Sequence, residues 1–151
     1  MRRLVPFLLL LLWIGFDDPA KAAFPGQNGK IAYSHSVCGQ SGCTENIFTV
    51  NENGTGRIQL TTSGQNRSPA WSADGTKIAF NSSRAPAGIW TMNADGSNQQ
   101  PLTEGSGAAW SPDGSKIAFT SFQSPSGIYV INADGSDRRL LLAGARETVM
   151  R

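Results

Sequence analysis

The sequence predicts an all-β chain made of repeated units, and two observations carry this prediction. First, residues 71–80 read WSADGTKIAF, and residues 110–119, 39 positions further on, read WSPDGSKIAF. Second, each unit holds short runs with period-two alternation, separated by Asx-Gly turns, which are hairpin signals. No segment after residue 22 shows the sustained apolar spacing of three and four that a helix needs.

The repeat keeps its register over most of the chain. At the offset of 39, Ile78 recurs as Ile117, Ile89 as Ile128, and NADG at 93–96 as NADG at 132–135. A more divergent copy precedes these two, because NGKIAY at 28–33 matches the KIAF segments and IFTVNENG at 47–54 matches IWTMNADG. We therefore expect units at about 28–66, 67–106 and 107–142, followed by a tail at 143–151.

Each unit divides into four short elements. In the middle copy we expect strands at 68–72, 77–82 and 88–93 and a weak one near 100–103, with Ile78 and Phe80 on one face and Ala79 on the other. A period near 40 with four strands per unit is typical of a β-propeller blade. A leucine-rich or hexapeptide solenoid has a shorter period, and an immunoglobulin-like sandwich does not repeat its sequence.

The repeat is defined by its turns and its tryptophans. In an Asx-Gly turn the glycine supplies the positive φ and the aspartate caps its own backbone. The tryptophans recur with the unit, so we expect them to pack between sheets. These turn and packing residues are Trp71, Asp74, Gly75, Asp95, Gly96, Trp110, Asp113, Gly114, Asp134 and Gly135. A calcium loop is the alternative, but calcium needs six to eight oxygens and each turn offers one carboxylate.

The pattern W-S-x-D-G-x-K-I-A-F, then G-I-[WY]-x-[MI]-N-A-D-G-S, then a terminal L-T, resembles the TolB-like β-propeller repeat, also called the WD40-like Pro-Asp repeat. The resemblance covers about residues 28–142, with Trp110–Phe119 a near-consensus example. It implies a non-enzymatic propeller that binds proteins of the cell envelope. Similar repeats also form the propellers of prolyl-oligopeptidase-like peptidases, in which a separate α/β-hydrolase domain does the chemistry.

The number of blades leaves three interpretations open. The last two copies have all four expected strands, whereas no counterpart of the tryptophan-bearing strand is recognised before Asn28. Closed propellers have four to eight blades. The chain is therefore a partial propeller of about three blades: a truncated product of a larger propeller, half of a homodimer that completes a six-bladed ring, or an open arc. In a homodimer the tail at 147–150 could complete the partner's first blade.

The first 22 residues have the layout of a secretory signal peptide. Arg2 and Arg3 form a basic start, Leu4–Phe16 is an apolar run, and Ala20-Lys21-Ala22 is a small-residue cleavage pattern. The run is short for a spanning helix, although an uncleaved anchor stays an alternative. We expect cleavage after Ala22, a mature domain at 23–151, and a periplasmic or secreted location in a bacterium.

The two cysteines, Cys38 and Cys43, lie where the first copy has five extra residues: Ile31 to Ile47 spans 16 positions, against 11 from Ile78 to Ile89. In an exported protein such a pair is expected to form a disulfide that pins this longer loop. The alternatives are a metal site with His35, which lacks a fourth good ligand, a redox site, which fits the C-x4-C spacing poorly, and a binding role for the loop.

Composition and motifs argue against catalysis and nucleic-acid binding. Without Arg2, Arg3, Lys21, Asp17 and Asp18, the 13 basic and 11 acidic residues become 10 and 9, so no basic excess favours nucleic acid. His35 is the sole histidine and no G-x-S-x-G elbow occurs, so a serine triad has no support. We predict no catalytic residue, cofactor or metal. A sugar-stacking site on the tryptophans is the sharper alternative to packing.

The expected function is that of an exported protein-binding module, acting through blade ends and any central channel where loops of successive blades converge. The expected partners are proteins of the cell envelope or secreted proteins, or a second copy, with no nucleic acid and no membrane. A propeller domain of a hydrolase whose catalytic domain lies elsewhere is the alternative from the enzyme class, and a non-functional remnant is the third.

Overall fold

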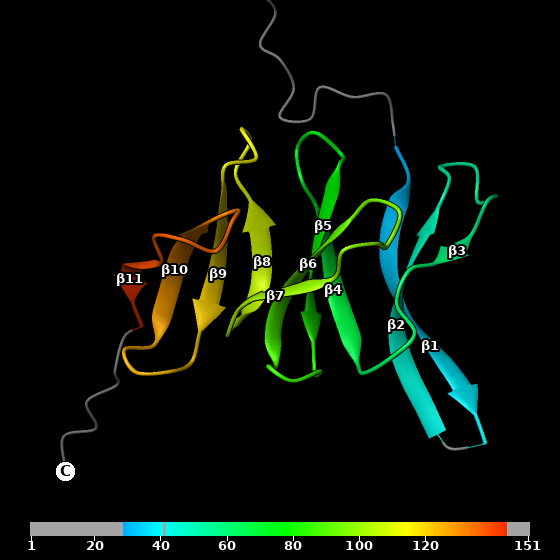
Figure 1. Cartoon of the computed structure of the whole chain (residues 1–151), viewed down its shortest axis with the longest axis horizontal. Helices are drawn as coiled ribbons and strands as arrows, with labels where there is room; N and C mark the ends of the chain where they lie inside the picture. Colours follow the sequence, from blue (N-terminus) through cyan, green and yellow to red (C-terminus); the bar gives the residue numbers. More distant parts are fainter. Residues whose placement is uncertain (1–28, 41, 145–151) are drawn as a thin grey trace, which may run out of the picture.

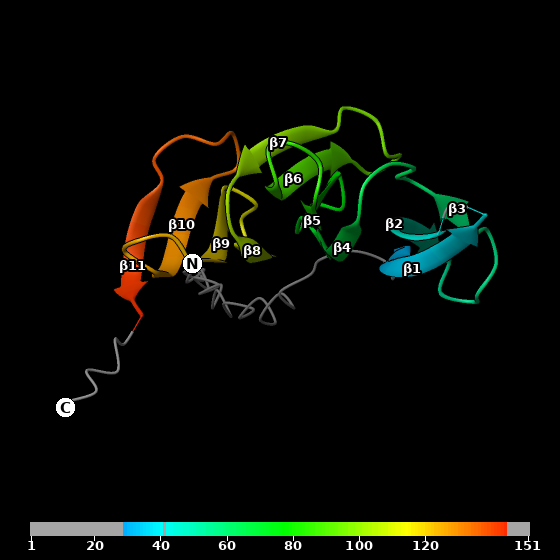
Figure 2. The same ribbon diagram turned by 90° about the horizontal axis from the view of Figure 1, so that it is seen from below.

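The computed structural model describes residues 29–40 and 42–144. The regular secondary structure of the described residues consists of strands, which form three separate antiparallel sheets joined by turns and connections. Figure 2 shows the sheets side by side in an open arc that does not close into a ring. The predicted fold class, an all-β partial propeller, is confirmed. The predicted signal peptide at 1–22 lies outside the described residues, as do residues 145–151 of the tail predicted at 143–151. Within those residues, no helix is long and apolar enough to cross a membrane.

Each sheet is one blade (Figure 1). The first contains β1 (Ile31–Gly39), β2 (Gly42–Val50) and β3 (Ile58–Gln59). The second contains β4 (Asn66–Trp71), β5 (Lys77–Ser82), β6 (Gly88–Asn93) and β7 (Gln100–Thr103). The third contains β8 (Ser106–Trp110), β9 (Lys116–Ser121), β10 (Gly127–Asn132) and β11 (Arg139–Ala143). The strands of each blade pair in sequence order, and the first blade has three strands among the described residues.

The alternation of the middle strand positions its side chains as the sequence predicts. Ile78 and Phe80 of β5 are fully buried on one face, against Ile47 and Leu60 of the first blade. Ala79, between them in sequence, faces the third blade. Since each buried side chain of this size contributes about 1.5–3 kcal/mol, the blades are held together by apolar packing across two interfaces.

The second interface repeats the first. Ile89 of the middle blade packs with Ile117, Phe119 and Tyr129 of the third blade. Trp71 lies against the first cluster and Trp110 against the second, so the two tryptophans occupy equivalent positions in successive interfaces. The rings of Phe119 and Tyr129 stack with their centroids 5.8 Å apart.

The first hairpin differs from the expected loop. The five extra residues extend the two strands instead, because β1 and β2 stay paired from Ile31↔Val50 to Gly39↔Gly42. Cys38 lies directly opposite Cys43 in this register. A disulfide joins them, with Cα atoms 4.0 Å apart, so the hairpin is cross-linked at its tip.

Candidate interaction surface

The meander topology sorts the connections onto two opposite edges of the blades (Figure 1). The edge drawn uppermost carries the Asx-Gly turns at 51–57, 72–76, 94–99, 111–115 and 133–138, and we call it the turn face. The opposite edge carries the β1–β2 tip and the connections 83–87 and 122–126, and we call it the hairpin face. Because connections carry function more often than strands, these edges are the surfaces to compare.

On the turn face, Asp74 and Asp113 are engaged within their own turns. Asp74 accepts hydrogen bonds from the Ser72 hydroxyl at 2.6 Å and from the Thr76 backbone N–H at 3.1 Å. Asp113 accepts from the Ser111 hydroxyl at 2.5 Å and from the Ser115 N–H at 3.0 Å. These bonds favour the carboxylate and hold the pKa of each group at about 2.

The second pair of turns is built the same way. Asp95 accepts from the Ser97 N–H at 2.9 Å, and Asp134 accepts from the Ser136 N–H at 2.9 Å. The serine hydroxyls of these two turns also donate to the same carboxylates, and the pKa of both aspartates is lowered. The following glycines have positive φ: Gly75 (70°), Gly96 (86°), Gly114 (71°) and Gly135 (88°). In all four turns the carboxylate therefore serves the local backbone.

No metal-binding arrangement is formed by the described residues. No turn contributes more than two carboxylates, and no group of three or more His, Cys, Asp or Glu side chains in residues 29–40 and 42–144 could hold an ion. His35 lies edge-on to Phe48, with ring centroids 5.7 Å apart, and so packs as an aromatic side chain.

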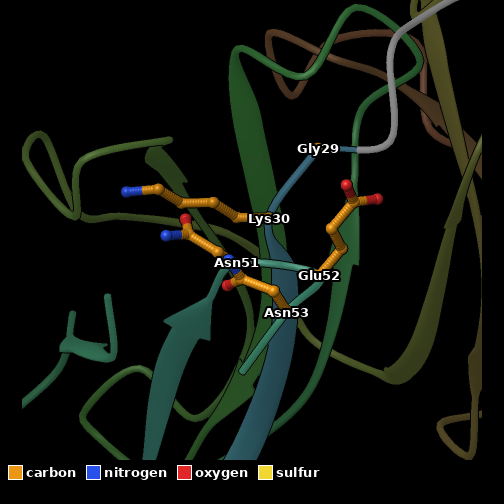
Figure 3. Close-up of a pocket in the computed structure, with 5 residues that line it drawn as sticks. All are labelled: Gly29, Lys30, Asn51, Glu52 and Asn53. Carbon is orange, nitrogen blue, oxygen red and sulfur yellow. The ribbon is translucent and has the colours of Figure 1, made fainter. Parts of the chain in front are cut away.

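One open hollow lies on the turn face of the first blade, with a volume of about 350 Å³. It is lined by Gly29, Lys30, Asn51, Glu52 and Asn53. Figure 3 shows the side chains of Lys30 and Asn51 extending in one direction and that of Glu52 in another. Since the polar groups diverge and the hollow is open, it does not enclose a small molecule in the way typical ligand sites do.

Two repeat-equivalent aromatic residues, Trp90 of β6 and Tyr129 of β10, are bonded to the connections of the hairpin face. Trp90 donates its indole N–H to the Pro86 carbonyl at 3.0 Å, and the Tyr129 hydroxyl donates to the Pro125 carbonyl at 2.6 Å. Both rings are buried. The guanidinium of Arg84 lies 4.1 Å from the Trp90 ring centroid. Neither ring offers a free face, so these two aromatic residues do not form a sugar-stacking site.

The disulfide-linked hairpin is tied to the second blade by Gln65. Its amide oxygen accepts from the Glu45 N–H at 2.9 Å, and its amide nitrogen donates to the Cys43 carbonyl at 3.2 Å. Arg67 and Glu45 form an ion pair across the same junction. The hairpin is thus cross-linked near its tip by the disulfide, and its strand β2 is held against the neighbouring blade at Cys43 and Glu45, close to the same tip.

Phe122 is an apolar side chain of the hairpin face that the sequence analysis missed. It begins the β9–β10 connection and is 80% exposed. Val37, next to the disulfide, is 39% exposed. The sequence signal that could have identified Phe122 is a difference between repeats, because the equivalent residue 39 positions earlier is Ser83. Because aromatic residues are enriched at protein-binding hot spots, this exposed ring is a candidate contact for another protein.

Comparison with known proteins supports the fold. No family model matches the chain, and no curated protein matches it. Among solved structures, a protein described as TolB from Agrobacterium tumefaciens is similar over 72% of this chain and 44% of its own, at 24% identity and a TM-score of 0.61. The fold is TolB-like.

Two further structures agree. TolB from Acinetobacter baumannii matches over 83% of this chain and 33% of its own, at 19% identity and a TM-score of 0.62. The β-propeller domain of the Trilobed protease from Pyrococcus furiosus, which has an open velcro topology, matches over 81% and 42%, at 16% identity and a TM-score of 0.62. The chain spans less than half the length of each of these structures, and the likeness is one of fold.

Proposed function

We propose that this chain is an exported, non-enzymatic module that binds another protein of the cell envelope or a secreted protein through its hairpin face. The observation that carries the proposal is Phe122, an apolar side chain left 80% exposed on the edge that also holds the cross-linked hairpin. Aromatic residues are enriched among the side chains that contribute most to protein binding.

Several features support protein binding rather than catalysis as the function of this chain. Four aspartates of the turn face accept hydrogen bonds from their own turns: Asp74, Asp95, Asp113 and Asp134. The rigid tip at Cys38–Cys43 reduces the conformational entropy lost when a partner binds. The disulfide suits an oxidising compartment, and the leader-like start of the sequence suits export.

A second candidate is a propeller domain that serves a hydrolase encoded elsewhere. It is favoured by the similarity to the propeller of the Trilobed protease and to an acylaminoacyl peptidase from Pyrococcus horikoshii, the latter at 17% identity and a TM-score of 0.54. In that case the bound partner is a catalytic domain.

Site-specific photocrosslinking tests the proposal. A benzophenone amino acid is placed at Phe122 on the hairpin face and, as the matched control, at Glu52, which is exposed on the turn face. We expect a discrete protein adduct in the native host from position 122 and none from position 52. A hydrolase in the adduct identifies the second candidate. No adduct from 122, or equal adducts from both positions, contradicts the proposed function.

A further inference from the structure

Repeat-equivalent residues at the end of the third blade are uncovered. Ile89 of the middle blade is fully buried against the third blade, whereas Ile128, 39 residues later, is 44% exposed. Leu60 and Leu102 each pack against the next blade, whereas Leu141, which follows Leu102 by 39 positions, is 55% exposed. We call the surface of Ile128 and Leu141 the trailing face.

The opposite end of the arc shows the complementary situation. Ile78 and Ile117 are fully buried against the preceding blade, whereas Ile31, their counterpart in the first copy, is 53% exposed. Tyr33 is half-buried and stacks on Phe48 with centroids 5.9 Å apart, as Phe119 stacks on Tyr129. We call the surface of Ile31 and Tyr33 the leading face.

The two internal interfaces show what each of these faces fits. In both, an isoleucine and a leucine of one blade pack against an isoleucine and an aromatic ring of the next. The trailing face presents the first pair, Ile128 and Leu141, and the leading face presents the second, Ile31 and Tyr33. The two bare faces of one chain are therefore complementary to each other.

A polar contact follows the same pattern. Gln99, three residues before Leu102, donates across the interface to the Leu60 carbonyl at 2.9 Å. Arg138, three residues before Leu141, reaches back to Glu104 of the preceding blade. Arg57, three residues before Leu60, lies 4.3 Å from the Phe48 ring centroid, and its guanidinium has no hydrogen-bond partner among the described residues. Arg57 is therefore the repeat equivalent of Gln99 and Arg138, which both contact the preceding blade.

We propose that the occupant of these faces is a second copy of the chain. The trailing face of each copy packs on the leading face of the other, and Arg57 donates to the Leu141 carbonyl across each junction. Two such contacts related by a two-fold axis join three blades to three, giving six, within the range of closed propellers. The hairpin face stays free in this arrangement, so the proposal is independent of the binding function above.

The test measures mass in solution by light scattering, over a range of concentrations, for the chain purified after export. Ile128→Asp and Ile31→Asp each place a charge in one face. Phe122→Asp is the control, because it removes an exposed apolar side chain outside both faces. We expect twice the chain mass for the native protein and the control. Each face variant alone should be a monomer with an unchanged far-ultraviolet spectrum.

Mixing the two face variants is the decisive step. A mixed pair retains one junction with both faces native, so we expect a 1:1 heterodimer, whereas each variant alone has no intact junction. A native protein that stays monomeric at all concentrations, assemblies heavier than two chains, or failure of the mixture to associate would overturn the proposal. A dimer that survives Ile31→Asp and is lost with Ile128→Asp would also overturn it, because it indicates a trailing-to-trailing contact.

Discussion

The indole N–H of Trp110 donates to the carbonyl of Ala70 at 3.1 Å, and this bond joins the inner strands of adjacent blades. The equivalent indole N–H, that of Trp71, is buried and has no hydrogen-bond partner among the described residues. The difference has a simple origin. Trp110 lies beside β4 of the preceding blade, whereas the described part of the first blade has no inner strand to supply a carbonyl.

Trp110→Phe should therefore destabilise the protein more than Trp71→Phe. Both changes remove the same part of a ring. Only Trp110→Phe breaks a hydrogen bond and leaves the Ala70 carbonyl without this donor. We expect the free energy of unfolding to fall by about 1–2 kcal/mol more for Trp110→Phe. Urea unfolding followed by far-ultraviolet circular dichroism measures both values. Equal losses would show that the Trp110 bond contributes nothing.

The turn aspartates predict a loss of stability in acid. The pKa of Asp74 and of Asp113 is lowered to about 2 in the folded chain, from an ordinary value of 3.8. A lowered folded-state pKa stabilises the fold above the unfolded pKa, and this contribution disappears as the pH falls from about 4 toward 2. Asp74→Asn with Asp113→Asn should flatten the decline of the urea midpoint over this range. Carboxyl carbon shifts that titrate near 3.8 would contradict the assignment.

Loss of the disulfide should have a limited effect. The bond between Cys38 and Cys43 closes a short loop in strands that are already paired, so its contribution is at most about 2–3 kcal/mol. Cys38→Ser with Cys43→Ser should lower the unfolding temperature by several degrees and leave the strand content unchanged. Complete unfolding of the variant at room temperature would show that the hairpin carries more of the stability than its contacts indicate.

Ile89 and Ile128 are a matched pair for the packing between blades. Truncation of the fully buried Ile89 to alanine should cost about 2–5 kcal/mol. Ile128→Ala should cost less than about 1 kcal/mol in dilute solution, where a second copy does not cover it. Equal costs at the two positions at all concentrations would mean that Ile128 is already covered within one chain.

Strand positions were predictable from the sequence where local signals agree. The segments 77–82 and 88–93 match β5 and β6 residue for residue, because alternating apolar residues and Asx-Gly turns fix both ends. The strand expected at 68–72 is wrong at both ends, because β4 runs from Asn66 to Trp71. Ser68 has a positive φ of 52°, and the register shifts between Arg67 and Ala70. The third blade repeats this irregularity at Gly107, where φ is 69°, but a serine in the middle blade gives no signal of it.

Two features of the candidate surface could not be predicted. The polar segment Ser34–Ser36 shows no apolar alternation, so the sequence predicts a loop where the structure has extended pairing with Cys38 opposite Cys43. The exposure of Phe122 depends on its position at the start of a connection, where no neighbouring blade reaches it. Burial between blades is a tertiary property, and repeat-equivalent residues can differ in it: Ile89 is fully buried, whereas Ile128 is 44% exposed.

Hydrogen exchange most directly tests the stack of blades on which the account rests. The middle blade is covered on both faces, so amides of β5 and β6 should exchange slowest and open only with the whole fold. Amides of the turn at 72–76 should exchange many times faster. If β5 and β6 exchange as rapidly as that turn, the blades do not pack on one another, and the faces inferred from their packing do not exist.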